Sequence, residues 1–237
     1  MYGKMRKKFR EVIKQYNLAN SPIKVKAKAL SKKEALGDPI HDDYPLLKGK
    51  ESLMEADFLG SKGVAYSDMC ADFEGNLESI VNIDLKNNYY RAVFIAAINA
   101  VLKHLGLIEL TEHCRDNGPI DCANQLKNFL NETYSNKKIL LIGFQPRFAE
   151  ALTEKFDTKI VDLNSDNIGK KINGVSVESE NKTEELINQS DLLFVTSSTF
   201  VNGTASKFII PGKETIFYGV SGAGPTYLLN LERYCHQ

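Results

Sequence analysis

A dense cluster of hydroxyl and amide side chains ends the apolar run at residues 191–204 (DLLFVTSSTFVNGT). A helix expected from about Ser198 needs one hydroxyl as its cap, and its first turn has free N–H groups that favour an anion. The excess of polar groups indicates contact with a ligand, although local capping and turns would use some of them. The candidate ligand-binding residues of this cluster are Thr196, Ser197, Ser198, Thr199, Asn202, Gly203 and Thr204.

A second polar loop follows the apolar run at residues 137–144 (KKILLIGF). Gly143, Phe144, Pro146 and Arg147 stand where dinucleotide-binding folds carry their phosphate loop. That loop needs three glycines, which allow a tight turn and close approach of the backbone to pyrophosphate, and only Gly143 is present. Pro146 suits the first turn of a helix, where Arg147 would meet either an anion or solvent. The loop is therefore not a standard NAD site.

Two other expected strand ends carry candidate ligand contacts. Asp162 follows Gly143 by about twenty residues, the spacing at which an acidic residue binds a ribose hydroxyl. The spacing favours a nucleoside-type ligand, S-adenosylmethionine included, and the alternative is a carboxylate that faces only solvent. Ser221 and Gly222 follow the last expected strand, where small residues let the backbone approach a ligand or simply form a turn.

His113, Cys114 and Cys122 are the candidate metal ligands, and Cys235 and His236 lie at the far end of the chain. A set of one His and three Cys could bind zinc or another thiophilic metal ion. The spacing H-C-x₇-C matches no structural zinc motif, in which CxxC pairs dominate. The alternative is that Cys122 is buried on a helix and the other ligands are exposed without a metal.

Asn99 interrupts an otherwise apolar helix. A buried amide costs about 1–3 kcal/mol unless it is hydrogen-bonded, so Asn99 either ties two elements together or faces a cleft. Packing between domains is the favoured interpretation from this residue alone. The cleft hypothesis predicts that Asn99, Phe144 and Asn202 border one cavity.

The elements that must position these residues fall into two groups. The first group combines a helix at 9–18, an alternating strand at 23–30, two short strands joined through residues 60–63, and a long helix at 89–105 ended by Gly106. We expect a small antiparallel sheet packed on the long helix, an α+β domain. The second group alternates helices with strands that begin near Ile139, Lys159, Asp191 and Thr215, which predicts a parallel, Rossmann-like sheet.

The polar stretch ending in Asn117, Gly118 and Pro119 reads as a linker. The predicted organisation is an α/β protein with a small α+β domain at 1–108, a linker at 109–119 and a Rossmann-like domain at 120–237.

Composition indicates an ordinary globular protein of 237 residues, with 43% hydrophobic and 25% charged residues. Residues 1–37 hold eleven Lys/Arg against two Asp/Glu, but nucleic-acid binding is disfavoured because the segment reads as a short helix with solvated lysines and no aromatic interleaving that suggests base stacking. No secretory signal or membrane-length apolar run is visible, and four cysteines in this length suggest reduced thiols. We therefore expect a cytoplasmic protein without a membrane partner. Whether the protein forms a homodimer is left open by the sequence.

Several separated motifs in order resemble one known family: residues 48–68, 91–107, 113–123, 142–152 and 196–204. The chain resembles the uncharacterised heavy-metal chelation family, whose members pair an enolase-amino-terminal-like domain with a Rossmann-like domain. The resemblance implies a site in the interdomain cleft that binds metal or a metal-bearing small molecule. It points to Asn99, to residues 143–147 and to residues 196–204, while His113, Cys114 and Cys122 match a linker motif of part of the family. Enolase chemistry would require a carboxylate triad and a lysine. The sequence supplies no such set, so we do not infer that activity.

The leading functional hypothesis is therefore a protein that binds a small ligand or metal in the interdomain cleft, with catalysis left open and a thiophilic metal ion as its cofactor. The alternative is a transferase-like enzyme that places a nucleoside cofactor such as S-adenosylmethionine against Asp162. A third hypothesis is a non-catalytic subunit that uses the basic segment at residues 4–33.

Overall fold

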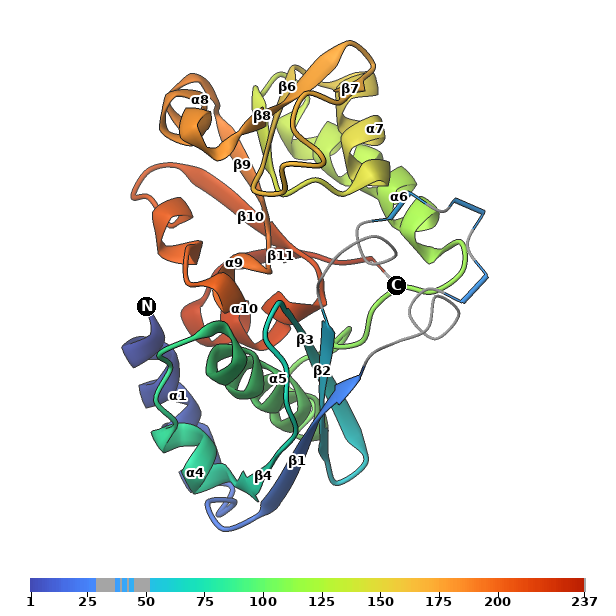
Figure 1. The fold of residues 1–237 in the computed structure, drawn as a ribbon. Helices are drawn as coiled ribbons and strands as arrows, with labels where there is room; N and C mark the ends of the chain where they lie inside the picture. Colours follow the sequence, from blue (N-terminus) through green and yellow to red (C-terminus); the bar gives the residue numbers. More distant parts are fainter. Residues whose placement is uncertain (29–36, 39, 42, 45–51, 237) are drawn as a thin grey trace.

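The computed structural model describes residues 1–28, 37–38, 40–41, 43–44 and 52–236. That part of the chain holds two sheets, one in the lower half and one in the upper half of the view in Figure 1. The first sheet is antiparallel and has the order β3-β2-β1-β4. Its strands are β1 (Pro22–Lys28), β2 (Ser52–Phe58), β3 (Ser61–Ser67) and β4 (Phe73–Asn76).

The antiparallel sheet follows the alternation of its sequence. In β1, Ile23 and Val25 are buried while Lys24 and Lys26 are exposed, so one face packs on the core and the other faces solvent. The turn between β2 and β3 is Leu59 and Gly60, both with positive φ. The predicted connection at 60–63 is thus too long, because residues 61–63 already belong to the strand.

The long helix α5 (Asn88–His104) packs against this sheet and is buried from Ala92 to Leu102. Helix α1 (Tyr2–Gln15) and helix α4 (Leu77–Asn82) lie beside it. Gly63 in β3 allows the close packing, because a Cβ at this position would lie 2.2 Å from the backbone nitrogen of Ala100. The other side of α5 contacts α9 (Thr199–Asn202) and α10 (Ala223–Leu229), so the helix is enclosed by both halves of the molecule.

The second sheet has the order β11-β10-β9-β5-β6-β8-β7. Its parallel strands are β5 (Ile139–Ile142), β6 (Thr158–Asp162), β8 (Val175–Ser179), β9 (Leu192–Thr196), β10 (Glu214–Tyr218) and β11 (Glu232–Tyr234), and β7 (Lys171–Ile172) pairs antiparallel at the edge. The four predicted strands are mutually parallel, which confirms the α/β class. Three strands of this sheet were not predicted, namely β7, β8 and β11, and β4 of the first sheet was not predicted either.

Both faces of the parallel sheet are covered. Leu141 and Phe194 face a core made with α6 (Gly118–Tyr134) and α7 (Pro146–Lys155). Leu140 and Val195 face the opposite side, where the hydrophobic core continues through α8 (Thr183–Gln189) and into α5. Helix α6 begins at Gly118 with Pro119 in its first turn, so the end of the predicted linker is helical. None of the described helices is both long enough and apolar enough to span a bilayer.

Candidate functional site

The strand order places a crevice at the carboxyl end of β5. The chain leaves β5 toward β6 on one side, whereas β9 lies on the other side of β5, so the connections after β5 and β9 run in opposite directions. In doubly wound sheets, ligands bind in the crevice that opens where the strand order reverses. The loops at residues 143–145 and 197–198 flank this position.

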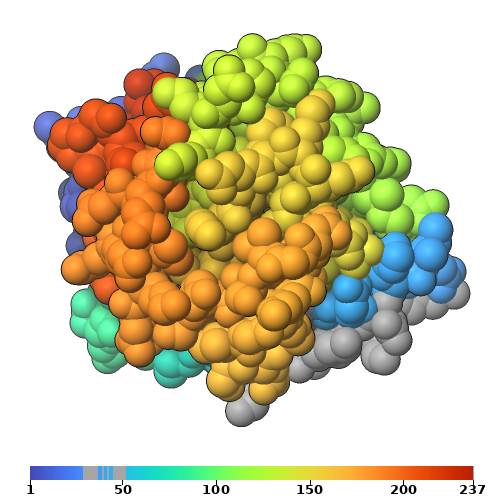
Figure 2. Space-filling view, turned by 90° about the horizontal axis from the view of Figure 1, so that it is seen from above, coloured from blue at the N-terminus to red at the C-terminus, as the bar shows by residue number. Residues whose placement is uncertain are grey.

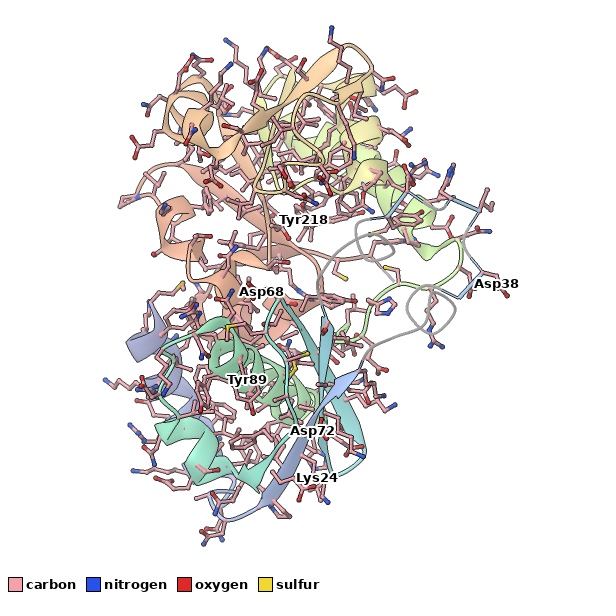
Figure 3. All side chains as sticks on the ribbon, in the orientation of Figure 1. Lys24, Asp38, Asp68, Asp72, Tyr89 and Tyr218 are labelled. Atoms are coloured by element: carbon pink, nitrogen blue, oxygen red, sulfur yellow. The ribbon has the colours of Figure 1, made fainter. Side chains whose placement is uncertain are left out.

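An open cavity of about 1640 Å³ lies at this crevice. This volume exceeds the 300–1,000 Å³ typical of small-molecule pockets, so the cavity is a cleft large enough for a ligand that carries several chemical groups. Asp68, just after β3, and Tyr218, at the end of β10, both line it where the two halves meet (Figure 3). The predicted residues that line it are His113, Cys114, Cys122, Gly143, Phe144, Asp162, Thr196, Ser197, Ser198, Thr199, Asn202, Thr204 and Ser221.

Asp162 fixes the loop that follows β5. Its Oδ2 accepts a hydrogen bond from the backbone N–H of Phe144 at 2.5 Å, and its Oδ1 accepts one from Asn164 at 2.7 Å. The side-chain oxygen of Gln145 caps α7 by accepting the N–H of Phe148 at 2.5 Å. The backbone N–H groups of Phe144 and Phe148, which a pyrophosphate would need as donors, are therefore hydrogen-bonded within the protein. This agrees with the absence of two of the three glycines of a phosphate loop.

Gly143 brings the loops after β5 and β9 together. Its φ is +89°, and a Cβ there would lie 2.5 Å from Cγ2 of Thr196. Tyr218 closes the same corner by donating its hydroxyl hydrogen to the carbonyl of Gly143 at 2.7 Å, and burial raises the pKa of this phenol. Tyr218 was not singled out from the sequence, although its position at a strand end was the available signal.

The hydroxyl cluster after β9 is arranged differently from the expectation. Helix α9 has a single turn, Thr199–Asn202, and Gly203 ends it with a φ of +86°. The helix expected from about Ser198 is thus only one turn long, and Gly203 does not line the cavity. Thr199 donates to the carbonyl of Thr196 at 2.6 Å, whereas Oγ of Ser197, a residue 2% exposed, has no hydrogen-bond partner among the described residues.

Three cysteines gather at the other end of the cavity. Cys114 lies between α5 and α6, Cys122 lies on α6, and Cys235 follows β11; all three line the cavity. A hydrogen bond between the thiols of Cys114 and Cys122 lowers the pKa of Cys122 to about 7 and raises that of Cys114. Burial raises the pKa of Cys235. The hydroxyl of Tyr234 donates to the carbonyl of Cys122 at 2.6 Å and so attaches the end of the chain to α6.

His113 is held beside this thiol cluster. Its Nδ1 lies 2.7 Å from the carbonyl oxygen of Cys114, so Nδ1 carries the hydrogen and Nε2 has a free lone pair. Burial lowers the pKa of the imidazole, which favours its neutral form. Nevertheless, no group of three or more His, Cys, Asp or Glu side chains within the described ranges stands ready to hold one metal ion.

The charge of the cavity wall is negative. Among the described residues that line it, the carboxylates belong to Asp68, Asp162, Asp166, Glu180 and Glu184, and Lys207 is the single Lys or Arg. Such a wall favours a cation or a ligand with positive charge over a free anion. Glu180, Glu184 and Lys207 were not among the residues singled out from the sequence, because their loops carry no motif.

Comparison with known proteins identifies a family. Residues 128–223 match the family described as "Putative heavy-metal chelation". This match confirms the family resemblance. No curated protein is detectably similar to the chain in sequence.

Two solved structures from the same family share the fold. One is a protein of unknown function from Pyrococcus horikoshii, with 17% identity, a TM-score of 0.58, and coverage of 93% of this chain and 79% of that chain. The other, of unknown function from Desulfitobacterium hafniense DCB-2, has 11% identity, a TM-score of 0.55, and coverage of 75% of this chain and 72% of that chain. At these identities the likeness concerns the fold alone.

Besides Gly203, four other predicted residues of the site lie outside the cavity wall. Arg147 pairs with Asp43 at 2.6 Å and with Glu150 at 2.9 Å, so its expected anion is a carboxylate of the protein. The described residues 37–38, 40–41 and 43–44 lie at the edge of the visible face, beside α6 (Figure 2). Pro146 is buried in the first turn of α7, and Gly222 packs against the side chain of Ser197.

Asn99 is the fourth, and it is fully buried between the two halves. Its side-chain nitrogen donates to the carbonyls of Val64 at 2.9 Å and Val220 at 3.3 Å. Asn99 therefore holds β3 against the loop after β10, and the prediction that it borders the cavity is wrong. The interdomain interpretation of this residue agrees with these contacts.

Proposed function

We propose that the chain binds a metal-bearing small molecule in the cavity between its two sheets. The observation that carries the proposal is that one cavity contains both the hydrogen-bonded thiols of Cys114 and Cys122 and the strand ends at residues 143–145 and 197–198. Thiols are donors for soft metal ions, and strand ends of this kind bind organic ligands. The division into domains at 1–108 and 120–237 is part of the proposal, with the site between them.

The donor set favours a complex over a bare ion. A structural metal site needs about four protein ligands, whereas Cys114 and Cys122 supply two, with no third ligand in place among the described residues. The remaining coordination positions would be filled by donors of the small molecule. A cavity of about 1640 Å³ leaves room for that molecule, and its acidic wall suits a complex with net positive charge.

A cadmium titration tests this function. Untagged, reduced protein is titrated with Cd²⁺ while the ultraviolet charge-transfer band of the cadmium–thiolate bond is recorded. We expect one bound ion per chain, lost in Cys114→Ser and Cys122→Ser and kept in Cys70→Ser, because Cys70 is exposed and does not line the cavity. Equal binding by Cys114→Ser and wild type would contradict a role for the thiols.

Glycine, a small bidentate chelator, tests the mixed-ligand part of the proposal. If two thiolates leave coordination positions open, glycine joins the bound ion, and more cadmium is retained after desalting than without it. A fall in retained cadmium would mean that the chelator only competes, and that the site takes a bare ion.

The second candidate function is a transferase-like enzyme with a nucleoside cofactor. Asp162 favours it, because this carboxylate ends the strand next to β5 and lines the cavity, the usual position of the ribose partner. S-adenosylmethionine carries positive charge, which suits the acidic wall. A rise in Tm with S-adenosylmethionine, abolished in Asp162→Ala, would favour this candidate, and no rise at millimolar cofactor would exclude it.

A further inference from the structure

We propose that Cys114 and Cys122 are a reversible dithiol–disulfide pair that is oxidised by small-molecule disulfides entering the cavity. The inference does not rest on the proposed function, because the pair can be oxidised whether or not the cavity binds a metal. Three observations support it: the contact between the thiols, their access to the cavity, and the meeting of three chain segments at this point.

The contact between the thiols is direct. Cys114 and Cys122 are hydrogen-bonded through their side chains although they belong to different elements, the segment before α6 and α6 itself. A disulfide requires two cysteines that are neighbours in space, a condition that thiols in contact already meet.

Access differs between the two thiols. Cys114 is partly exposed and Cys122 is only 4% exposed, yet both line a cavity wide enough for a small molecule. A small disulfide in the cavity therefore has access to the pair, and the thiol that does not react first is placed to resolve the mixed disulfide. Cys70 is exposed elsewhere and has no such neighbour in the cavity wall.

The reaction balances as thiol–disulfide exchange. One thiolate of the pair attacks a small disulfide RSSR, forms a mixed disulfide and releases one RS⁻. The thiolate of the other cysteine then attacks the protein sulfur of that mixed disulfide and releases the second RS⁻. The two protons of the protein thiols pass through water to the two RS⁻, so one dithiol and one RSSR give one protein disulfide and two RSH. Two electrons move from the protein to the small disulfide.

Oxidation of the pair would restrain the part of the cavity wall formed by α6 and the segment before it. Cys122 is already attached through its carbonyl to Tyr234 of the C-terminal strand, and Asp116, beside Cys114, accepts the N–H of Asp38 at 2.9 Å. A disulfide would covalently join the segment at 109–117 to α6 at the point where these contacts meet.

Peptide mapping of protein equilibrated in glutathione buffers tests the inference. Trypsin cleaves after Lys103, Arg115 and Lys127, so the two cysteines fall in separate peptides, 104–115 and 116–127, and Cys235 falls in 234–237. We expect a disulfide between the first two peptides that dithiothreitol removes. Its ratio to the dithiol should follow the disulfide concentration divided by the square of the thiol concentration, as an intramolecular disulfide requires. For a mixed disulfide, the ratio to the dithiol would instead follow the disulfide concentration divided by the first power of the thiol concentration.

The controls separate this result from its alternatives. Cys70→Ser should form the linked peptides as wild type does, whereas Cys114→Ser should not form them. If Cys122→Ser fails to fold, the wild-type map and Cys235→Ser still decide, because Cys235→Ser should retain the link. Linkage of Cys122 to Cys235, or glutathione adducts without linkage, would overturn the proposal.

Discussion

The side-chain oxygen of Asn99 accepts a hydrogen bond from the backbone N–H of Gly224 at 2.7 Å. The same amide donates to the carbonyl of Val64 in β3, so one side chain on α5 bonds to the antiparallel sheet and to the helix that follows β10. Because the cavity lies between these halves, Asn99 stabilises their packing around the cavity without lining the cavity itself.

Asn99→Ala should lower the free energy of unfolding by about 1–3 kcal/mol, because several backbone groups lose a buried partner. Urea denaturation measures the loss. Asn128→Ala on α6 is the matched control, since Asn128 is exposed and helical, so the gain in helix propensity is common to both changes. Equal stabilities of the two variants would contradict the structural role of Asn99.

Gly143→Ala should be more damaging than Gly60→Ala, although both glycines have positive φ, +89° and +85°. At Gly60 an added Cβ meets nothing within 4 Å, so the cost is the left-handed backbone alone, about 1–2 kcal/mol. At Gly143 the Cβ also meets Thr196 at 2.5 Å. Denaturant midpoints measure the difference, and equal losses would mean that the loops after β5 and β9 are not in close contact.

Asp162→Asn should loosen the loop after β5. The backbone N–H of Phe144 would exchange a charge-assisted hydrogen bond for a neutral one, a loss of about 1 kcal/mol. Amide hydrogen exchange at Phe144 should become several-fold faster. Asp166→Asn, a neighbouring carboxylate of the cavity wall, should leave that exchange rate unchanged. Unchanged exchange in Asp162→Asn would show that the carboxylate does not hold this loop.

Glu232→Gln should stabilise the protein at neutral pH. Burial, with a smaller contribution from Glu214, raises the pKa of Glu232 above its ordinary value of 4.5. A raised carboxylate pKa means that the folded state binds protons more tightly, so ionisation costs stability as pH rises from 4.5 through the folded pKa. The gain in Glu232→Gln should therefore be present at pH 7 and vanish below pH 4.5.

Thermal unfolding across pH measures that gain. Glu11→Gln, at an exposed position on α1, is the control and should bring none. A gain in Glu232→Gln that persists below pH 4.5 would rule out the titration of this group as its cause.

Local patterns in the sequence predicted the elements with strong periodicity. The apolar runs at 139–142 and 192–196 became central parallel strands, and the alternating Ile23, Lys24, Val25 and Lys26 became a strand with one exposed face. Strands β4, β7, β8 and β11 were missed because they lie at or next to the edges of their sheets, where few residues are buried and the pattern is weak.

The site was less predictable than the fold, because its contacts join residues far apart in the chain. Arg147 meets Asp43 and Tyr234 meets Cys122, pairs separated by 104 and 112 positions, and no local spacing indicates either. The strand-end rule found Gly143, Asp162 and Thr196 because it depends on topology alone. Only the tertiary structure brings the cysteine cluster to the same cavity.

Locating a bound metal ion tests the central claim most directly. Crystals of the untagged, reduced protein are soaked in Cd²⁺, and anomalous scattering is measured from wild type and from Cys114→Ser. The proposed function predicts that the strongest wild-type peak lies inside the cavity and contacts the sulfurs of Cys114 and Cys122, and that it is absent from the variant. Cadmium found only on the outer surface, as at the exposed Cys70, would contradict the claim that this cavity is the metal-binding site.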